Sequence, residues 1–230
     1  MIEEPPILTV LDAEKRPRPD HALLAPFENV PTGNVCDAMD GSGALDPAIK
    51  PLAGLPERVV GPALTVDCGP RDLLALVGAL SEIELGDVLV VATGGWRQSA
   101  VIGDLVTGMA KNSGAVAVVT DGVVRDIAGL REVGLPIYTT GVSPNSPFVN
   151  GPGQIGVPVV IGGRQVASGD LVVGDADGIV TVPRSEVAAV GARLETIKSL
   201  EAELEAKVKA GLKIQPEIVE LMQSARVKRI

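Results

Sequence analysis

Short apolar runs alternate with amphipathic segments in the middle of the chain. Residues 84–93 (ELGDVLVVAT), 115–122 (AVAVVTDG) and 135–141 (LPIYTTG) each contain a short, nearly continuous apolar stretch. Stretches of this length without polar alternation are typical of strands buried on both faces of a sheet. The segments 103–113 and 125–134 lie between them, and each predicts a helix that stops at a glycine. This β–α–β–α–β order predicts parallel strands joined by right-handed crossovers.

Before this unit, the chain predicts an irregular arm and three short elements. Five prolines interrupt residues 1–30, which we expect to form the arm. The elements expected next are a helix over 31–40 capped by Thr32 or Asn34, a strand over 57–68 with a glycine–proline interruption, and a helix over 71–83.

After the unit, a loop-rich stretch over 142–161 leads into residues 162–183. These predict antiparallel strands around turns at Ser168-Gly169 and Asp177-Gly178. The pair Asp175 and Asp177 resembles a calcium loop only superficially, because the full ligand set is missing, so we interpret it as a hairpin turn.

A long amphipathic helix is expected from Ser185 to Gly211. The residues predicted on its apolar side are Val187, Val190, Leu194, Ile197 and Leu204. Its glutamates and lysines predict a solvated opposite side. An exposed terminal helix of this kind often packs on a neighbouring subunit.

Composition and charge narrow the class of protein. Hydrophobic residues make up 46% of the chain and aromatic residues only 2%, so the core must consist of Val, Leu, Ile and Ala. The net charge of −9 argues against nucleic-acid binding, which needs a basic surface. It also means that an anionic substrate needs a local positive site.

The sequence offers no pattern typical of a disulfide framework, a signal peptide or a membrane span. Cys36 and Cys68 show no metal-ligand spacing and read as buried apolar residues, without a disulfide. The acidic, proline-broken start does not resemble a signal peptide, and no apolar stretch approaches the ~18 residues of a membrane span. We therefore expect a cytoplasmic protein with no membrane partner.

Candidate chemistry concentrates at two junctions where a strand ends and a helix begins, the place where ligands bind in parallel α/β proteins. Gly103-Asp104 opens the first helix, and the N–H groups of Leu105 and Val106 would point outward to a carboxylate. Arg125-Asp126 opens the second. Asp126 offers oxygen ligands for Mg²⁺ or Mn²⁺, and Arg125 a permanent charge for an oxyanion. An aspartate at the start of a helix, taken alone, is more often a simple N-cap.

A family resemblance bears on this choice. The hallmark of the family is an aspartate, twenty intervening residues and Arg-Asp, which Asp104 and Arg125-Asp126 meet. Residues 103–144 resemble the class II pyruvate aldolases that cleave 4-hydroxy-4-methyl-2-oxoglutarate and 4-carboxy-4-hydroxy-2-oxoadipate, which are grouped with the ribonuclease E activity regulator A proteins. The resemblance extends to VCDAMDGSG, GDVLVV and SGDLVVGDADGIVTVP, and covers most of the chain from about 30 to 210.

The resemblance implies an α/β fold of the swivelling β/β/α type, with a central parallel or mixed sheet and a C-terminal helix. We place the catalytic β/β/α domain at 31–184, after the arm at 1–30 and before a C-terminal helical segment at 185–230. The implied assembly is a homotrimer or a dimer of trimers, with active sites between subunits.

The resemblance also implies roles for single residues. Asp126 matches the metal ligand, Asp104 a ligand acting through water, and Arg125 the group that stabilises the enolate. The segment Gly103 to Val106 matches the substrate-binding loop, in which the amides of Leu105 and Val106 hold the pyruvyl carboxylate. Glu201 matches an acidic group donated to the neighbour's site, although a solvated helix face is the more common explanation of a glutamate that lies among other glutamates.

Several positions depart from the pattern of the family. Asp72 and Leu76 stand where aldolases often carry Asn and, four residues later, His. The single histidine, His21, lies in the arm and reads as a surface residue. Trp96 and Arg97 follow a Gly-Gly turn and either line the pocket, where they would bind a distal carboxylate, or only pack the loop.

The leading functional prediction is a divalent-metal-dependent lyase. It would cleave a 4-hydroxy-2-oxo diacid, decarboxylate oxaloacetate, or do both, giving pyruvate, with Mg²⁺ or Mn²⁺ as cofactor and a small 2-oxo acid as substrate. The alternative is a non-enzymatic regulator that binds a ribonuclease through its acidic surface. An α/β protein acting on an unrelated metabolite remains open if the spacing match is accidental.

Overall fold

Four parallel strands form the centre of the protein. The computed structural model describes residues 6–230, so the first five residues of the predicted arm lie outside the described part. The central strands, in spatial order, are β3 (Val59–Asp67), β4 (Val88–Ala92), β6 (Ala117–Thr120) and β8 (Ile137–Thr139). All three pairings between them are parallel, and β4 is buried throughout. The predicted parallel sheet is confirmed.

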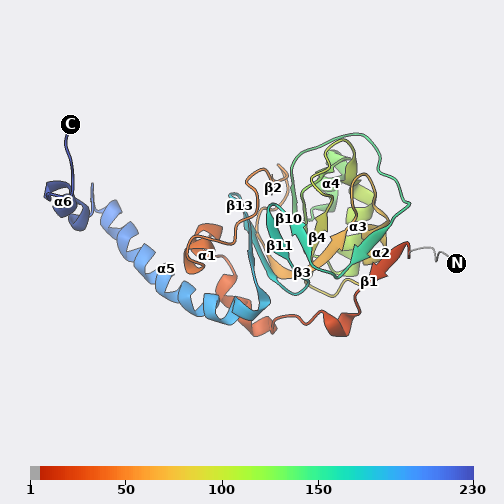
Figure 1. Ribbon diagram of the computed structural model, residues 1–230, viewed down its shortest axis with the longest axis horizontal. Coiled ribbons are helices and arrows are strands. Elements are labelled where there is room, and N and C mark those ends of the chain that lie inside the picture. The colour runs from red at the N-terminus through yellow and green to blue at the C-terminus, as the bar shows by residue number, and fades with distance from the viewer. Residues whose placement is uncertain (1–5) are drawn as a thin grey trace.

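The crossover helices begin and end close to where the pattern predicts. Helix α3 (Asp104–Ser113) ends at Gly114, and α4 (Ile127–Val133) ends at Gly134. Both glycines have left-handed backbones, with φ of 109° and 69°, a conformation that side chains with a Cβ rarely adopt. Figure 1 shows α2, α3 and α4 grouped at one end of the molecule.

Strand β3 runs without a break through the predicted glycine–proline interruption, but it changes partners there. Up to Pro62 it pairs antiparallel with β12 (Leu171–Asp175). From Ala63 onward it pairs parallel with β4. Gly61 makes this exchange sterically possible, because a Cβ at that position would lie against the carbonyl oxygen of Gly86. The strand therefore joins the hairpin layer to the parallel sheet.

The structure contains one of the two predicted hairpins, and a different hairpin replaces the other. The hairpin of β12 with β13 (Gly178–Val182) forms around Asp177-Gly178, as predicted. The prediction of a second hairpin at Ser168-Gly169 is wrong, because β11 (Arg164–Val166) pairs with β10 (Val159–Ile161) instead. Gly162 and Gly163, both with positive φ, make the tight turn between β10 and β11.

The remaining short strands extend the edges of the sheet or form a small separate one. Strand β1 (Leu8–Val10) pairs parallel with β9 (Gly153–Ile155), which itself pairs with β3, while β2 (Lys50–Pro51) pairs antiparallel with β8. A separate two-stranded sheet consists of β5 (Ala100–Ile102) and β7 (Val123–Val124).

The N-terminal segment is held by ion pairs to the loop between α2 and β4. After β1 it forms three 3-10 turns, Ala13–Lys15, His21–Leu23 and Ala25–Phe27. Arg16 pairs with Glu82 at 2.6 Å, and Arg18 with Asp87 at 3.1 Å. Burial raises the pKa of Asp87, so its pairing with Arg18 offsets part of the cost of burying this carboxylate.

Helices α1 (Thr32–Ala38) and α2 (Leu74–Ala79) are shorter than predicted. Neither Thr32 nor Asn34 caps α1 with its side chain, and Pro31 occupies the cap position. Asp175 supplies the cap from the β12–β13 hairpin, accepting the N–H and the hydroxyl of Thr32, each at 2.8 Å. Burial acts to raise the pKa of Asp175, but the hydrogen bonds from Thr32 and Asp177 outweigh it and the pKa is lowered.

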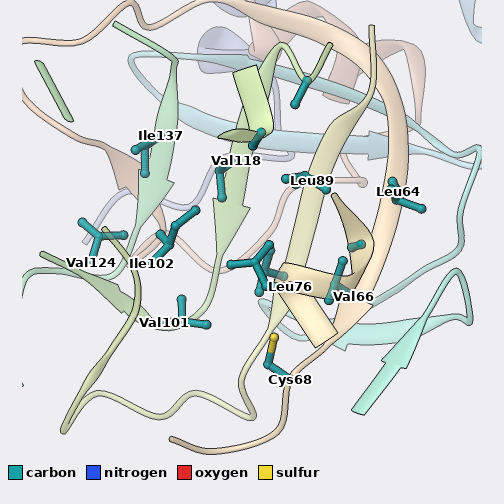
Figure 2. Close-up of a cluster of buried hydrophobic side chains, with 14 of the residues drawn as sticks. Leu64, Val66, Cys68, Leu76, Leu89, Val101, Ile102, Val118, Val124 and Ile137 are labelled. Atoms are coloured by element: carbon teal, nitrogen blue, oxygen red, sulfur yellow. The ribbon is translucent and has the colours of Figure 1, made fainter. Parts of the chain in front are cut away.

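The core between the sheet and helices α2, α3 and α4 consists of aliphatic side chains, as the composition predicts. Leu64, Leu76 and Ile102 belong to this cluster, and Figure 2 shows Leu76 near its middle. Cys68 is 2% exposed in the same cluster, and burial raises the pKa of its thiol to about 12. The thiol is therefore protonated at neutral pH.

The long helix α5 (Val187–Lys209) leaves the body of the protein, followed by α6 (Pro216–Gln223) (Figure 1). Val187, Val190 and Leu194 are buried against α1 and the hairpin layer, as predicted, whereas Leu204 is 37% exposed. Of the helices described, none has the length and apolarity needed to cross a membrane.

Candidate active site at the starts of helices α3 and α4

The small β5–β7 sheet brings the two predicted junctions together. Strand β5 leads directly into α3, and β7 leads directly into Arg125. Because β5 and β7 are parallel, their ends lie at the same edge, and the Arg125 N–H donates to the carbonyl of Ile102 at 3.1 Å. The starts of α3 and α4, 21 residues apart in the sequence at Asp104 and Arg125, are thus neighbours in space.

Two glycines let the carboxylates lie against the facing helix start. A Cβ on Gly129 of α4 would lie 2.7 Å from the Cβ of Asp104, and a Cβ on Gly103 would lie 2.5 Å from Oδ2 of Asp126. Each aspartate therefore occupies the space that a side chain at the opposite glycine would fill. Asp126 also has a left-handed backbone (φ 60°), which Asp tolerates better than most residues.

The guanidinium of Arg125 is held from two sides. Its Nε donates to Oδ2 of Asp126 at 3.1 Å, and its Nη1 donates to the hydroxyl of Ser146 at 2.6 Å. The Arg125 side chain is 36% exposed and that of Asp126 43%, so both remain open to a small molecule. The planar guanidinium is thus positioned before any ligand arrives.

A cavity of about 120 Å³ lies at this place. All six predicted residues of the metal and substrate site line it: Gly103, Asp104, Leu105, Val106, Arg125 and Asp126. The structure thereby brings the predicted set together around one space. The N–H of Leu105 already donates to Oδ1 of Asp104 at 2.7 Å, so an incoming carboxylate would have to share or replace this hydrogen bond.

Glu201 does not belong to this cavity within one chain. It lies on α5 and accepts a hydrogen bond from Asn34 of α1. Figure 1 shows α5 leaving the body on the side away from α3 and α4. A catalytic role of Glu201 therefore requires the site of a neighbouring subunit.

The two positions that depart from the family pattern serve the fold. Leu76 is fully buried in the core. The carboxylate of Asp72 accepts the N–H groups of Leu74 and Asn150, both at 2.8 Å. Neither residue lines the cavity, and neither do Trp96 and Arg97.

Sequence reasoning missed the loop after β8, which borders the cavity. Pro147 of this loop lines the cavity, as does Leu73 just before α2. Ser146 of the loop accepts a hydrogen bond from the catalytic candidate Arg125. A proline-rich loop gives no periodicity that would indicate which of its side chains turn inward. Only the fold places this loop beside the start of α4.

The fold and this pocket define a class, namely layered α/β proteins of the swivelling β/β/α type with a polar site where two crossover helices begin. The chain belongs to the RraA-like family described as Aldolase/RraA, which matches residues 32–181. A protein of Halalkalibacterium halodurans named "Putative 4-hydroxy-4-methyl-2-oxoglutarate aldolase" is 38% identical over 188 residues, which cover 82% of this chain and 88% of that protein.

Solved structures agree with this assignment. An uncharacterized protein from Pseudomonas syringae pv. tomato matches with a TM-score of 0.75 at 29% identity, over 86% of this chain and 96% of that one. Streptomyces coelicolor RraAS2, described as an unusual member of the RNase ES inhibitor RraA protein family, matches with a TM-score of 0.74 at 31% identity, over 83% and 100% of the two chains. The family and the fold predicted from the sequence are confirmed.

Proposed function

We propose that this protein is a divalent-metal-dependent lyase that forms pyruvate from a 4-hydroxy-2-oxo diacid, from oxaloacetate, or from both. The observation that carries the proposal is the convergence of Asp104, Arg125 and Asp126 on one small cavity. The relative with an aldolase name supports the same activity. A protein that only binds a partner would have no need of an arginine fixed beside two accessible aspartates.

The donor set suits a hard cation that keeps most of its waters. Only one oxygen of Asp126 binds Arg125, and only one oxygen of Asp104 binds Leu105, so in the described part of the chain each carboxylate keeps one oxygen without a hydrogen bond. No group of three His, Cys, Asp or Glu side chains close enough to share a metal occurs among residues 6–230. Few carboxylates and several waters are typical of Mg²⁺ and Mn²⁺. Asp126 would hold the metal and Asp104 one of its waters; when bound, the metal supplies Lewis-acid polarisation of the 2-oxo acid.

The residues of the chain then account for the reaction. The start of α3, at Leu105 and Val106, binds the carboxylate of the 2-oxo acid, because the N–H groups there carry the positive end of the helix dipole. The N–H of Leu105 shares or exchanges its hydrogen bond to Asp104 when the carboxylate binds. Arg125 lies where it can stabilise negative charge that develops on the C2 oxygen. The C3–C4 bond breaks and its electrons form the enolate of pyruvate, while the C4 hydroxyl passes its proton to water held by Asp104 and becomes a carbonyl. A proton returned to C3, through water held by Asp104, completes pyruvate.

We further propose that the protein works as a homotrimer or a dimer of trimers, with Glu201 reaching a neighbour's cavity. Large apolar side chains at the cavity and on the segment after β8 are exposed within one chain: Leu105, which lines the cavity, is 78% exposed, Val142 57% and Val149 56%. Exposed apolar groups around a polar site are typical of a surface that another protein covers. Mass measurement in solution tests the assembly, and a monomer would contradict it.

The test of the activity is pyruvate formation from 4-hydroxy-4-methyl-2-oxoglutarate and from oxaloacetate, with Mg²⁺, with Mn²⁺ and after chelation. We expect turnover with metal and its loss in Arg125→Ala and Asp126→Ala, with folding checked by circular dichroism. The matched control is Arg184→Ala, since Arg184 is exposed and lies outside the cavity. A folded wild type that is inert on both substrates with metal present would refute the proposal.

The likeness to RraAS2 favours a second candidate, a regulator that binds a ribonuclease. The net charge of −9 would suit a basic partner surface. A pull-down with a purified RNase E-type enzyme tests this, together with Arg125→Ala. Binding that the variant retains, in a protein without lyase activity, would establish regulation instead of catalysis.

A further inference from the structure

Arg71 has a backbone conformation that its residue type rarely adopts. Among residues 6–230, it alone has a positive φ (63°) without being Gly, Asn or Asp. A long side chain in the left-handed region is strained, and such strain persists only where the surrounding contacts impose it. Strained residues of this kind cluster at binding sites, and Asp126 in the cavity is another in this chain.

The contacts that impose this conformation join Arg71 to the loop over the cavity. The N–H of Phe148 donates to the carbonyl of Arg71 at 2.7 Å, and the N–H of Leu73 donates to the carbonyl of Phe148 at 3.0 Å. Asp72 fastens the same loop by accepting the N–H of Asn150. The segment before α2 and the loop after β8 are therefore locked side by side.

This arrangement places a guanidinium over an aromatic ring at the rim of the cavity. The Arg71 guanidinium carbon lies 4.2 Å from the centre of the Phe148 ring, within the range of a cation–π contact. Leu73, two residues after Arg71, and Pro147, immediately before Phe148, both line the cavity. The stacked pair thus lies beside two residues of the cavity wall, although neither Arg71 nor Phe148 lines the cavity itself. Stacking fixes the face of the guanidinium and leaves the N–H groups along its edge to bind a ligand.

The charge of Arg71 stacks on Phe148 but forms no ion pair among residues 6–230. Its side chain is exposed, and among the described residues no carboxylate lies within ion-pair distance of it. Arg125, the arginine that lines the cavity, is already engaged by Asp126 and Ser146. A substrate with a second carboxylate needs another cation in a protein that carries a charge of −9.

We propose that Arg71, held by its stack on Phe148, binds the carboxylate at the far end of the substrate and so makes the enzyme select diacids. The inference rests on the proposed lyase function and specifies its substrate class. Arg71 acts here as a specificity residue, since it contacts the part of the molecule that does not react. Binding of this distal group orients the C3–C4 bond over Arg125.

The test compares two substrates that differ in the distal carboxylate. One is 4-hydroxy-4-methyl-2-oxoglutarate, and the other is the monoacid 4-hydroxy-2-oxopentanoate, both with Mg²⁺. We expect Arg71→Gln to lower kcat/KM for the diacid about tenfold to a hundredfold, mainly through KM, and to leave the monoacid within about twofold. Arg71→Lys keeps the charge and should restore part of the loss, while Phe148→Leu removes the stack and should give a smaller loss in the same direction.

Arg97→Gln is the matched comparison, because Arg97 is an exposed arginine on the neighbouring 94–97 turn. We expect it to leave the preference for diacids unchanged. Equal loss on both substrates in Arg71→Gln would show that Arg71 only supports the fold, and no loss, or a loss in Arg97→Gln instead, would overturn the assignment.

The two proposals fail in different ways. A wild type that turns over neither substrate refutes the lyase function. Calorimetry with 2-oxoglutarate and pyruvate as unreactive probes then tests Arg71 by itself. A diacid preference that Arg71→Gln abolishes supports the site, and an equal preference in wild type and variant refutes it.

Discussion

The Gly129→Ala substitution tests whether the placement of Asp104 matters, without changing any polar group of the site. The new Cβ would lie 2.7 Å from the Cβ and 2.8 Å from the Cγ of Asp104. Rotation of the aspartate cannot relieve the contact between the two Cβ atoms, because the backbone fixes both. The starts of α3 and α4 must therefore move apart by about 1 Å to reach ordinary van der Waals separation.

The cost of this movement is small compared with the stability of a folded domain. Overpacking of this kind costs about 1–3 kcal/mol. Replacing glycine by alanine inside a helix returns about 1 kcal/mol. The expected loss in the free energy of unfolding is therefore about 0–2 kcal/mol, within the ~5–15 kcal/mol of a typical domain. Since a misplacement of about 1 Å at an active site can cost about a hundredfold in rate, kcat/KM should fall by about that factor.

Pyruvate formation coupled to NADH oxidation measures the activity, and urea unfolding measures the stability. Gly108→Ala is the matched control, since it makes the same change inside α3. Its new Cβ would meet nothing closer than the Val133 Cγ2 at 3.8 Å. We expect this control to gain up to about 1 kcal/mol and to keep its activity. Wild-type activity in a folded Gly129→Ala variant would refute the reasoning that Asp104 must lie against α4.

Three further changes test other contacts. Ser146→Ala removes the 2.6 Å hydrogen bond that holds Arg125, so kcat/KM should fall about tenfold and Ser146→Thr should restore it; equal activity of all three proteins would exclude a positioning role. Gly103→Ala places a Cβ 2.5 Å from Oδ2 of Asp126, so calorimetry should show weaker Mn²⁺ binding, and unchanged affinity would argue against Asp126 as the ligand. Asp175→Ala should lower the free energy of unfolding at pH 7 by about 1–2 kcal/mol, because α1 loses its cap. Because the pKa of Asp175 is lowered on folding, its contribution is full above the unfolded value of 3.8 and is lost as the pH falls through the lower folded pKa. The difference between wild type and Asp175→Ala in urea unfolding should therefore shrink in acid, and a constant difference would contradict this account.

The alternating pattern of the chain predicted the centre of the fold because local rules govern it. The strands β4, β6 and β8 are short and mostly apolar, and every residue in them is buried. Gly114 and Gly134 end the helices between them with left-handed backbones. Parallel strands then bring successive strand-to-helix junctions to one edge. This is why Asp104 and Arg125-Asp126 could be expected to meet.

Contacts between distant segments decided what the sequence pattern predicted wrongly or left open. Strand β12 pairs with β3, which lies far earlier in the chain, while β11 pairs with its own neighbour β10. The cap of α1 comes from Asp175, which lies 143 residues after Thr32. No local rule can identify a partner at that separation.

The same division holds at the site. The sequence by itself determined which residues carry the charge and the carboxylates, because residue type and spacing are local properties. Only the tertiary structure decided that Gly103 and Gly129 make room for those carboxylates and that Ser146 holds Arg125. Only it placed Arg71 on Phe148 at the rim. Such steric fit depends on how close two backbones approach, and that distance is set when the whole domain packs.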